Sequence, residues 1–418
     1  MSDHNFSVFK FGGASLRDAQ AIQNAVEIIR DEGSPHQVVV VSAIGKSTNA
    51  LEAYLHAREE AEIQQSEKIL KELRELHRDI AVELGVWGQL EQDLDEVWQG
   101  VRAVPDAWTY GARYDATVCA GELASSKLLA AAIDSAAIGV QWVDARELIV
   151  TDTVHRRATV DWDATGVKVQ SLITSGLYVT QGFIARSDEG QNTTLGREGS
   201  DYSAAIIAHA LSASDLTIWK DVPGVMTGDP RVFEWAELLH EIPYHVAIEL
   251  AFYGASVIHP KTIQPVMRTG TALHVRSFLD ANSPGTVIHD CESLQPNLPC
   301  WIQKRDQVLI QIGTHDLSFL QEDQLASVYQ EFADAGLMIN LAQHGAVHSS
   351  FCATDDRIQM PNVLEALDSQ FALDFEKGLL LFTVHQPNDD AHIWLAEQGE
   401  VLLEQHHGDV SQILIRPY

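Results

Sequence analysis

Cysteine is scarce in this chain, and its four cysteines have no paired spacing: Cys119, Cys291, Cys300 and Cys352. A secreted fold stabilised by disulfides is therefore not expected. We expect the cysteines to be free thiols in a reducing cytoplasm. No run of about 18 apolar residues occurs, so no membrane-spanning segment is expected. The first residues, MSDHNFSVFKFGG, lack the basic flank, apolar core and cleavage site of a signal peptide. These absences together favour a cytoplasmic protein.

Positive charge is also scarce. The 28 lysines and arginines are outnumbered by 59 acidic residues, which gives a formal net charge of −31. Such a field repels nucleic acid and anionic membranes, so neither is expected as a partner. It repels ATP as well, so any nucleotide site must contain its own local cations. The hydrophobic content of 45% is enough to bury full cores, and the length suggests about two or three domains.

The first two thirds of the chain alternate strand and helix patterns, which predicts an α/β fold with a mostly parallel sheet. Residues 52–100 interrupt this rhythm with charged, strongly helix-forming sequence. We expect a helical excursion over about 52–110, at one edge of the sheet. Strands are predicted at 6–11, 38–41, 139–143, 177–180, 216–219 and 271–276, and helices at 16–30, 116–132, 161–174, 201–211 and 246–253.

A linker rich in Asn, Ser, Pro and Gly covers 277–290. The order after it, over 307–375, is β-α-β-β-α-β, which is the ferredoxin-like order. A shorter echo follows over 379–416. We therefore predict a first domain at 1–289 and a second at 290–418. The second would hold two related units, about 301–376 and an abbreviated 377–418, as in a duplicated ligand-sensing module.

The tetrad Gly45-Lys46-Ser47-Thr48 looks like the end of a P-loop, the backbone cradle for nucleotide phosphates. That motif needs a glycine five residues before the glycine of Gly-Lys, and Val40 stands there, inside a predicted strand. A P-loop is therefore excluded by spacing.

The first strand offers a better phosphate site, with Lys10 at its end followed by Gly12 and Gly13. Glycines let the backbone approach an anion, and a lysine adds a mobile positive charge. The alternative is an ordinary surface lysine beside a glycine turn.

Three later loops offer further charged groups. In TTLGREGSDYSAA, Arg197 suits bidentate carboxylate binding, while Ser200 and Asp201 start a helix and have helix capping as their alternative role. The loop WKDVPGVMTGDPR follows a strand, where α/β sheets bind ligands, although it could be a plain connection. It contributes Lys220, Asp221 and Arg231, and YGASVIHPKT contributes Lys261.

Six motifs occur in order: KFGG-S, VVSA…T, GE at 121–122, LGR-GSD at 195–201, KDVPGV…DPR at 220–231 and GA-VIHPKT at 254–262. Together they resemble the aspartate kinases of the amino acid kinase family, over about residues 6–289, and the tail resembles the paired ACT domains of those enzymes. The resemblance implies the amino acid kinase fold, a central mostly parallel sheet with helices on both faces, plus two ferredoxin-like ACT units. It also implies a homodimer and an amino acid effector, lysine or threonine, at the ACT region.

The implied reaction is phosphorylation of the β-carboxylate of L-aspartate by ATP, with Mg2+ carried by the nucleotide and no separate metal site. It opens the pathway to lysine, threonine and methionine. Lys10 and Asp201 would be the catalytic residues. The implied aspartate contacts are Glu122 (α-amino group), Arg197 (α-carboxylate), Ser42, Thr48, Ser200 and Phe183; the implied ATP contacts are Lys10, Phe11, Gly12, Gly13, Ser15, Lys220, Asp221, Met226, Arg231 and Lys261.

The chemistry agrees with these residue types. A β-carboxylate with a reference pKa of about 3.9 is already ionised at neutral pH, so the reaction needs charge neutralisation rather than a general base. Four positions depart from the common family pattern: Ala14 replaces threonine, Glu198 glycine, Ser256 lysine and Met226 tyrosine. Two alternatives stay open: a glutamate-type kinase of the same family, and a non-catalytic amino-acid-sensing relative.

Overall fold

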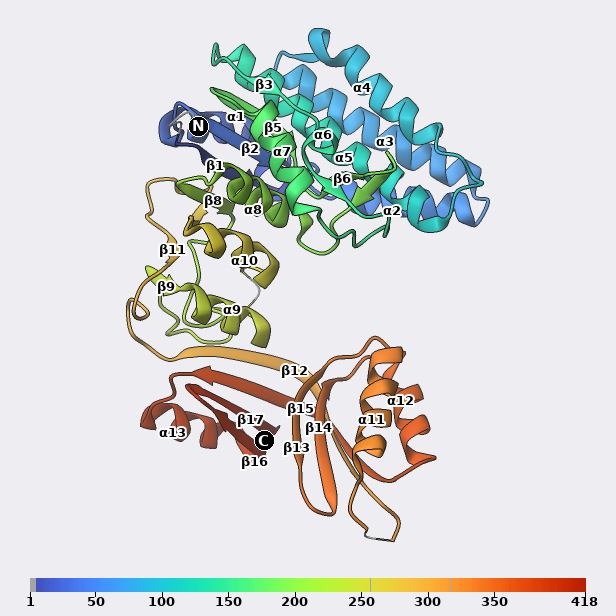
Figure 1. Cartoon of the computed structure of the whole chain (residues 1–418), viewed down its shortest axis with the longest axis vertical. Helices are drawn as coiled ribbons and strands as arrows, with labels where there is room; N and C mark the ends of the chain where they lie inside the picture. Colours follow the sequence, from blue (N-terminus) through green and yellow to red (C-terminus); the bar gives the residue numbers. More distant parts are fainter. Residues whose placement is uncertain (1–4, 256, 317) are drawn as a thin grey trace. The chain divides into compact units, whose positions relative to one another are not determined.

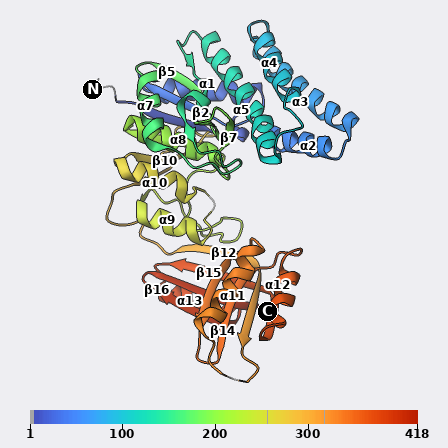
Figure 2. The ribbon, with the colours of Figure 1, turned by 45° about the vertical axis from the view of Figure 1, so that its right-hand side comes forward.

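The computed structural model describes residues 5–255, 257–316 and 318–418. The chain divides into two compact units, coloured blue to yellow and orange to red for the most part in Figures 1 and 2. The first comprises Met1–Val225, Leu238–Ile248 and Val257–Pro296, and the second Met226–Glu237, Glu249–Ser256 and Asn297–Tyr418. The predicted fold class is confirmed. The division after Pro296 lies seven residues beyond the predicted boundary, and two short earlier segments join the second unit.

The first unit is built on an eight-stranded sheet of order β3-β5-β2-β1-β8-β10-β11-β9. Its paired neighbours run parallel except β10 and β11. Every residue of β1 and β2 is buried, as the continuous apolar runs predict. The strands are β1 (Ser7–Phe11), β2 (Gln37–Val41), β3 (Gln141–Trp142), β5 (Leu177–Gln181), β8 (Asp215–Lys220), β9 (Glu241–Pro243), β10 (Ala272–Ser277) and β11 (Thr286–His289). A smaller sheet joins β4 (Val150–Thr151), β6 (Ile184–Ser187) and β7 (Asn192–Thr194).

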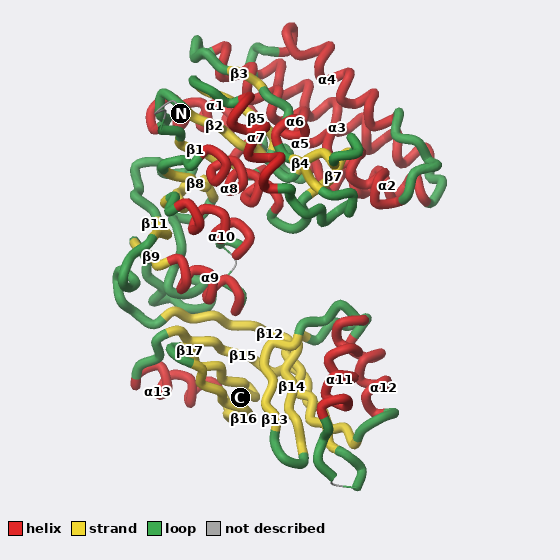
Figure 3. The backbone as a smooth tube through the Cα atoms, in the orientation of Figure 1, coloured by secondary structure: helices red, strands yellow, loops and turns green. Residues whose placement is uncertain are grey.

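Helices pack on both faces of the large sheet. Successive strand residues point to opposite faces, and because every residue of β1 and β2 is buried, both faces are covered there. Phe9, Val39 and Val41 share one core with α1 and α5, whereas Lys10 points to the opposite face, where it meets α8. The charged segment forms α2, α3 and α4, whose apolar sides extend the first core. The helices are α1 (Ala19–Glu32), α2 (Ser47–Glu59), α3 (Ile63–Glu83), α4 (Trp87–Arg102), α5 (Tyr110–Ser135), α6 (Ala145–Leu148), α7 (Trp162–Leu172), α8 (Gly199–Leu211), α9 (Tyr244–Tyr253) and α10 (Pro260–Thr269) (Figure 3).

The helix predicted to begin at residue 16 begins at Ala19 instead. Asp18 ends the preceding turn, because its Oδ1 accepts a hydrogen bond from the N–H of Ala21 at 2.8 Å and so caps α1. A short 3-10 helix, Gly13–Leu16, fills the interval between β1 and α1.

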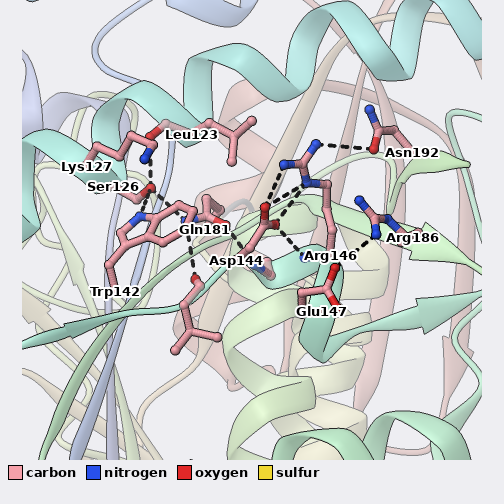
Figure 4. A network of polar contacts seen from close by, with 12 residues as sticks. Leu123, Ser126, Lys127, Trp142, Asp144, Arg146, Glu147, Gln181, Arg186 and Asn192 are labelled. Atoms are coloured by element: carbon pink, nitrogen blue, oxygen red, sulfur yellow. Dashed lines mark hydrogen bonds and ion pairs between the residues drawn. The ribbon is translucent and has the colours of Figure 1, made fainter. Parts of the chain in front are cut away.

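Helix α5 is long and apolar enough, by length and composition alone, to cross a membrane, yet 78% of its most apolar window is buried inside the protein, as in a core helix. Polar contacts fix it to the sheet (Figure 4). The hydroxyl of Ser126 accepts from Trp142 Nε1 of β3 at 2.9 Å and from Gln181 Nε2 of β5 at 2.7 Å. The other end of Gln181 accepts from the N–H of Ala145, which starts α6. One amide thus connects α5, β5 and α6.

The second unit is a six-stranded antiparallel sheet of order β13-β14-β12-β15-β17-β16. Its first half has the predicted β-α-β-β-α-β order, with α11 and α12 over one core. The strands are β12 (Cys300–Gly313), β13 (Ile339–His344), β14 (His348–Thr354), β15 (Ala372–His385), β16 (Gly399–His407) and β17 (Val410–Pro417), and the helices α11 (Glu322–Asp334), α12 (Met360–Asp368) and α13 (Asp389–Gln398).

The two halves are interleaved rather than placed one after the other. Residues 300–304 of β12 pair with 381–385 of β15, so the start of β12 supplies a strand to the abbreviated half. Compared with the ferredoxin-like order, the abbreviated half, whose residues are all described, then lacks its second helix. The segment Met226–Glu237 packs there instead: Phe233 lies in one core with Trp301, Phe382 and Leu395. The sequence did not predict this arrangement, because it joins residues about 70 positions apart or more.

We expect Phe233→Ala to lower the free energy of unfolding of the second unit by about 3–5 kcal/mol, since the ring is 1% exposed and its removal leaves a cavity. Urea unfolding of the full chain, followed by tryptophan fluorescence, measures the change. The neighbouring Trp235, which is 48% exposed, provides the matched control, and Trp235→Ala should cost much less. Equal losses for the two variants would contradict this role for Phe233.

Candidate active site

The predicted site residues converge because they follow strands that end at one edge of the parallel sheet. In the register, Phe11 pairs with Val41 on one side and with Trp219 on the other, and Val41 pairs with Gln181. The residues that come next in the chain therefore emerge together at the carboxyl edge. They are Gly12 and Gly13 after β1, Ser42 after β2, Phe183 after β5, and Lys220 and Asp221 at the end of β8.

The centre of this edge is a carboxylate shared by two lysines. Lys10 Nζ lies 2.6 Å from Asp201 Oδ1, and Lys220 Nζ lies 3.2 Å from Asp201 Oδ2. Asp201 is buried in the first turn of α8. Burial alone would raise the pKa of Asp201, but the ammonium groups of Lys10 and Lys220 outweigh it and hold the pKa below its ordinary value. Two positive charges and one negative charge leave a net cation, which favours a phosphate group.

Glycines bring the backbone close around this centre. A Cβ on residue 13 would lie 2.6 Å from the carbonyl oxygen of Ala43, so only glycine lets the loop after β2 lie against β1. The carbonyl of Gly13 accepts a hydrogen bond from the N–H of Gly45 at 3.0 Å. Lys46 is exposed and directly precedes α2. The hydroxyl of Ser15 is buried and has no hydrogen-bond partner among the described residues.

Glu122 is buried in α5, with 2% of its surface exposed. A Cβ on residue 121 would lie 2.9 Å from Cβ of Ala43, so Gly121 allows α5 to approach the loop after β2. Glu122 Oε1 accepts from the N–H of Ala43 at 3.4 Å, and Oε2 has no partner within the part of the chain that the structure describes. Burial raises the pKa of Glu122 to about 8. A cation brought to Oε2 would offset this cost.

A cavity of about 540 Å³ joins two predicted substrate residues, Phe183 and Arg197. Phe183 has a φ of +68°, and its N–H donates to Ser203 Oγ at 2.9 Å, which holds the backbone in this conformation. The ring packs against the cluster that contains Cys119 and Leu123, which flank Glu122 along α5. The other residues that line the cavity are Tyr114, His155, Arg156, Arg157 and Gly196.

These lining residues were not predicted. His155 is half-buried, and its Nδ1 lies 2.8 Å from Oδ2 of the buried Asp115. Asp115 also bonds the N–H of Arg156 and the hydroxyl of Thr194. The signal in the sequence was the run His-Arg-Arg at 155–157, a concentration of positive charge in a very acidic chain.

Other predicted residues are placed less tightly. Ser42 and Ser200 are half-buried. The carbonyl of Ser42 accepts a hydrogen bond from Ser125 Oγ at 2.7 Å. Ser200 lies against Gly182, and a Cβ added to residue 182 would lie 2.6 Å from the Cβ of Ser200. Thr48 is half-buried in the first turn of α2. Asp221 is exposed at the end of β8.

Three further residues predicted to contact ATP are Lys261, Met226 and Arg231, and these contacts stay predictions. Lys261 is exposed in the first turn of α10. Met226 and Arg231 belong to the second unit, where the exposed Arg231 pairs with Asp229 at 2.7 Å. Of the four departures from the family pattern, Ala14 is exposed, Glu198 is half-buried before α8 with a φ of +53°, and Ser256 lies outside the described residues.

The site fits a nucleotide. Two ammonium groups, the Gly12-Gly13 backbone and the unpartnered hydroxyl of Ser15 are all suited to phosphate oxygens. Among the described residues, one group of three potential metal ligands was found, Glu241, His289 and Cys291, and it lies at β9 and β11 rather than with the lysines. The arrival of magnesium with ATP stays a prediction.

Comparison with known proteins shows the family to which the chain belongs. Residues 5–277 match the family described as the amino acid kinase family. The chain is 31% identical over 389 residues to lysine-sensitive aspartokinase 3 of Escherichia coli, covering 90% of this chain and 85% of that protein. The structure of E. coli aspartokinase III with lysine and aspartate superposes with a TM-score of 0.83 at 26% identity, covering 99% of this chain and 96% of that one. The same enzyme with aspartate and ADP gives a TM-score of 0.80.

The raised pKa of Glu122 predicts how stability depends on pH in the ligand-free protein. Between about pH 4.5 and 8 the folded state holds a proton on Glu122 that the unfolded state releases, so this residue's contribution to the free energy of unfolding falls as pH rises. Glu122→Gln should therefore gain stability relative to the parent at pH 9 compared with pH 5. Urea unfolding at both pH values measures this, with the exposed Glu91→Gln as control. A difference between Glu122→Gln and the parent that does not change with pH would contradict the prediction.

Proposed function

The chain belongs to the amino acid kinase family, and we propose that it acts in that family as an aspartate kinase. It transfers the γ-phosphoryl group of ATP to the β-carboxylate of L-aspartate and forms 4-phospho-L-aspartate, at the entry to lysine, threonine and methionine synthesis. The observation that carries this function is the pair of lysines on one buried carboxylate, at the same sheet edge as the half-buried Phe183. Glu122 adds a buried Oε2 that has no partner among the described residues.

The reaction brings two anions together, and the site residues act on that problem. Lys10 and Lys220 place positive charge where the phosphoryl group transfers, and Asp201 fixes both ammonium groups before substrate arrives. Magnesium bound to ATP would add neutralising charge on the phosphate oxygens. The β-carboxylate attacks as an anion, so no group in the site has to remove a proton from it.

The amino acid is recognised by complementary charges at its backbone end. Glu122 Oε2, which is buried without a partner among the described residues, suits the α-ammonium group, and Arg197 in the cavity beside Phe183 suits the α-carboxylate. Glutamate carries the same α-groups, so a glutamate-type kinase is separated from an aspartate kinase by the reach of the side chain toward the lysines. The aspartokinase relatives favour aspartate, and the intact lysine–aspartate centre disfavours a non-catalytic relative.

Purified protein with ATP, magnesium and L-aspartate should form an acyl phosphate that hydroxylamine traps as a hydroxamate. Lys10→Ala should lower kcat by about 100-fold or more, because it removes a preorganised cation from the transferring group. Lys46→Ala is the matched control, an exposed lysine in the loop after β2 that should leave kcat unchanged. Hydroxamate formed with L-glutamate and none with L-aspartate would instead identify a glutamate-type kinase.

The second unit is the proposed seat of regulation and of homodimer formation, and a cytoplasmic location is proposed with them. An E. coli relative is named as lysine-sensitive, and its structure was solved with lysine. An effector can inhibit only if it binds one conformational state of the enzyme more tightly than another.

We expect L-lysine to lower the rate of hydroxamate formation at subsaturating aspartate. The assay compares L-lysine, L-threonine and both together, with D-lysine as a control for ionic strength and charge. Inhibition by threonine alone would reassign the effector. An unchanged rate under all three conditions would contradict regulation and leave the second unit a structural role.

A further inference from the structure

The cavity beside Phe183 holds more positive charge than a single carboxylate contact requires. Arg156, Arg157 and Arg197 all line it, and none of the three has an ion-pair partner among the described residues. Arginines elsewhere in the first unit commonly pair with carboxylates, such as Arg74 with Asp95 at 2.6 Å. In a chain with a net charge of −31, unpaired arginines gathered on one cavity indicate a site for an anion.

The backbone at Arg156 is held in an unusual conformation. Its φ is +68°, a region that glycine adopts freely and an arginine does not. The carboxylate of Asp115, which is 0% exposed, accepts from the N–H of Arg156 at 3.2 and 3.1 Å and contacts His155 Nδ1 at 2.8 Å. The surroundings thus impose a turn that points to a function for this side chain.

The same turn is fixed to the segment that leads to Arg197. Asp115 Oδ1 also accepts from the hydroxyl of Thr194 at 2.7 Å, and the carbonyl of Thr194 accepts from the N–H of Ala158 at 2.9 Å. A Cβ on residue 196 would lie only 3.2 Å from the carbonyl oxygen of Arg156. Asp115 therefore sets the relative position of the segments that carry Arg156 and Arg197.

Aromatic rings restrict the guanidinium group of Arg156. Its Cζ lies 4.8 Å from the centre of the Tyr114 ring and 5.6 Å from that of Tyr110. An arginine stacked on a ring keeps its N–H groups free at the edge of its plane, where they can bind a carboxylate.

Glu198 gives a reason for a second arginine. It directly follows Arg197, and its Oε2 is buried without a partner in the part of the chain that the structure describes. A carboxylate next to Arg197 weakens the positive potential there, so another cation is needed to bind an anionic group well.

We propose that Arg156 is a second carboxylate-binding residue of the amino acid site, acting with Arg197 on the substrate's α-carboxylate, and that Asp115 is the positioning residue that holds it there. This inference rests on the proposed aspartate kinase function. It names two residues beyond the predicted set and gives the departure at Glu198 a compensating partner.

The test is the KM for aspartate in the hydroxamate assay. Arg156→Gly suits the observed φ, so the fold should tolerate it, and the KM should rise about 10- to 100-fold, as for a lost charge-assisted hydrogen bond, with kcat within about threefold. Glu198→Gly is the matched control: it also puts glycine at a positive φ but removes a negative charge, and it should not raise the KM.

Three outcomes overturn the proposal. A KM for Arg156→Gly within about twofold of the parent would show that the guanidinium does not bind substrate. Equal rises for Arg156→Gly and Glu198→Gly would trace the effect to the backbone. A parent enzyme with no aspartate-dependent hydroxamate would refute the proposed function itself, and that failure is visible before any variant is made.

Asp115→Asn tests the positioning role separately. It should raise the KM for aspartate while kcat is retained, and the rise should be smaller in the Arg156→Gly background than in the parent, because the two changes act through one contact. Thermal unfolding checks that each variant is folded. Equal rises in both backgrounds would show that Asp115 does not act through Arg156.

Discussion

The shared ion pair of Asp201 with Lys10 and Lys220 is the interaction on which the site depends. A chain with a net charge of −31 repels nucleotides at long range, so a nucleotide can bind only where several cations lie close together. The ammonium groups of Lys10 and Lys220 would repel each other if no carboxylate lay between them. Asp201 removes that repulsion, and its own burial is tolerable only because both lysines are present. The burial of Asp201 and the close approach of the two lysines therefore depend on each other.

The parallel sheet decides where this group forms. Lys10 and Lys220 lie near the ends of two neighbouring strands, and Asp201 lies in the first turn of the helix that packs on them. Three residues far apart in sequence therefore meet at one edge. This is why so much could be predicted from sequence. Buried apolar runs identify the strands, and polar residues that directly follow parallel strands must gather together. The fold class and the convergence of Lys10, Asp201 and Lys220 needed no more than that and the family resemblance.

The remaining features depend on contacts that no local pattern marks. The turn at Arg156 is held by Asp115, which lies 41 positions earlier on a helix that reads as plain core. The start of β12 pairs with the end of β15 across an entire intervening half-domain. In the same way, Phe233 follows the loop of residues 220–231 closely in sequence, but it packs into the core of the second unit against residues far along the chain. In each case a residue or strand has several possible partners of similar chemistry far away in the sequence. The sequence alone does not indicate which of these partners it contacts in the folded protein.

In the proposed aspartate kinase, Glu122 is the residue that makes the site select for an amino acid and not merely for an anion. The cations of the cavity and of the sheet edge would attract any dicarboxylate. Burial raises the pKa of Glu122 to about 8, and its Oε2 has no partner among the described residues, so the carboxylate is ionised at low cost only when a cation lies against it. An α-ammonium group supplies that cation, whereas a dicarboxylate without an amino group leaves Glu122 protonated or uncompensated. On this proposal, the desolvation that disfavours an ionised Glu122 in the empty site becomes binding energy specific for a zwitterion, and the arginines need only position its carboxylate.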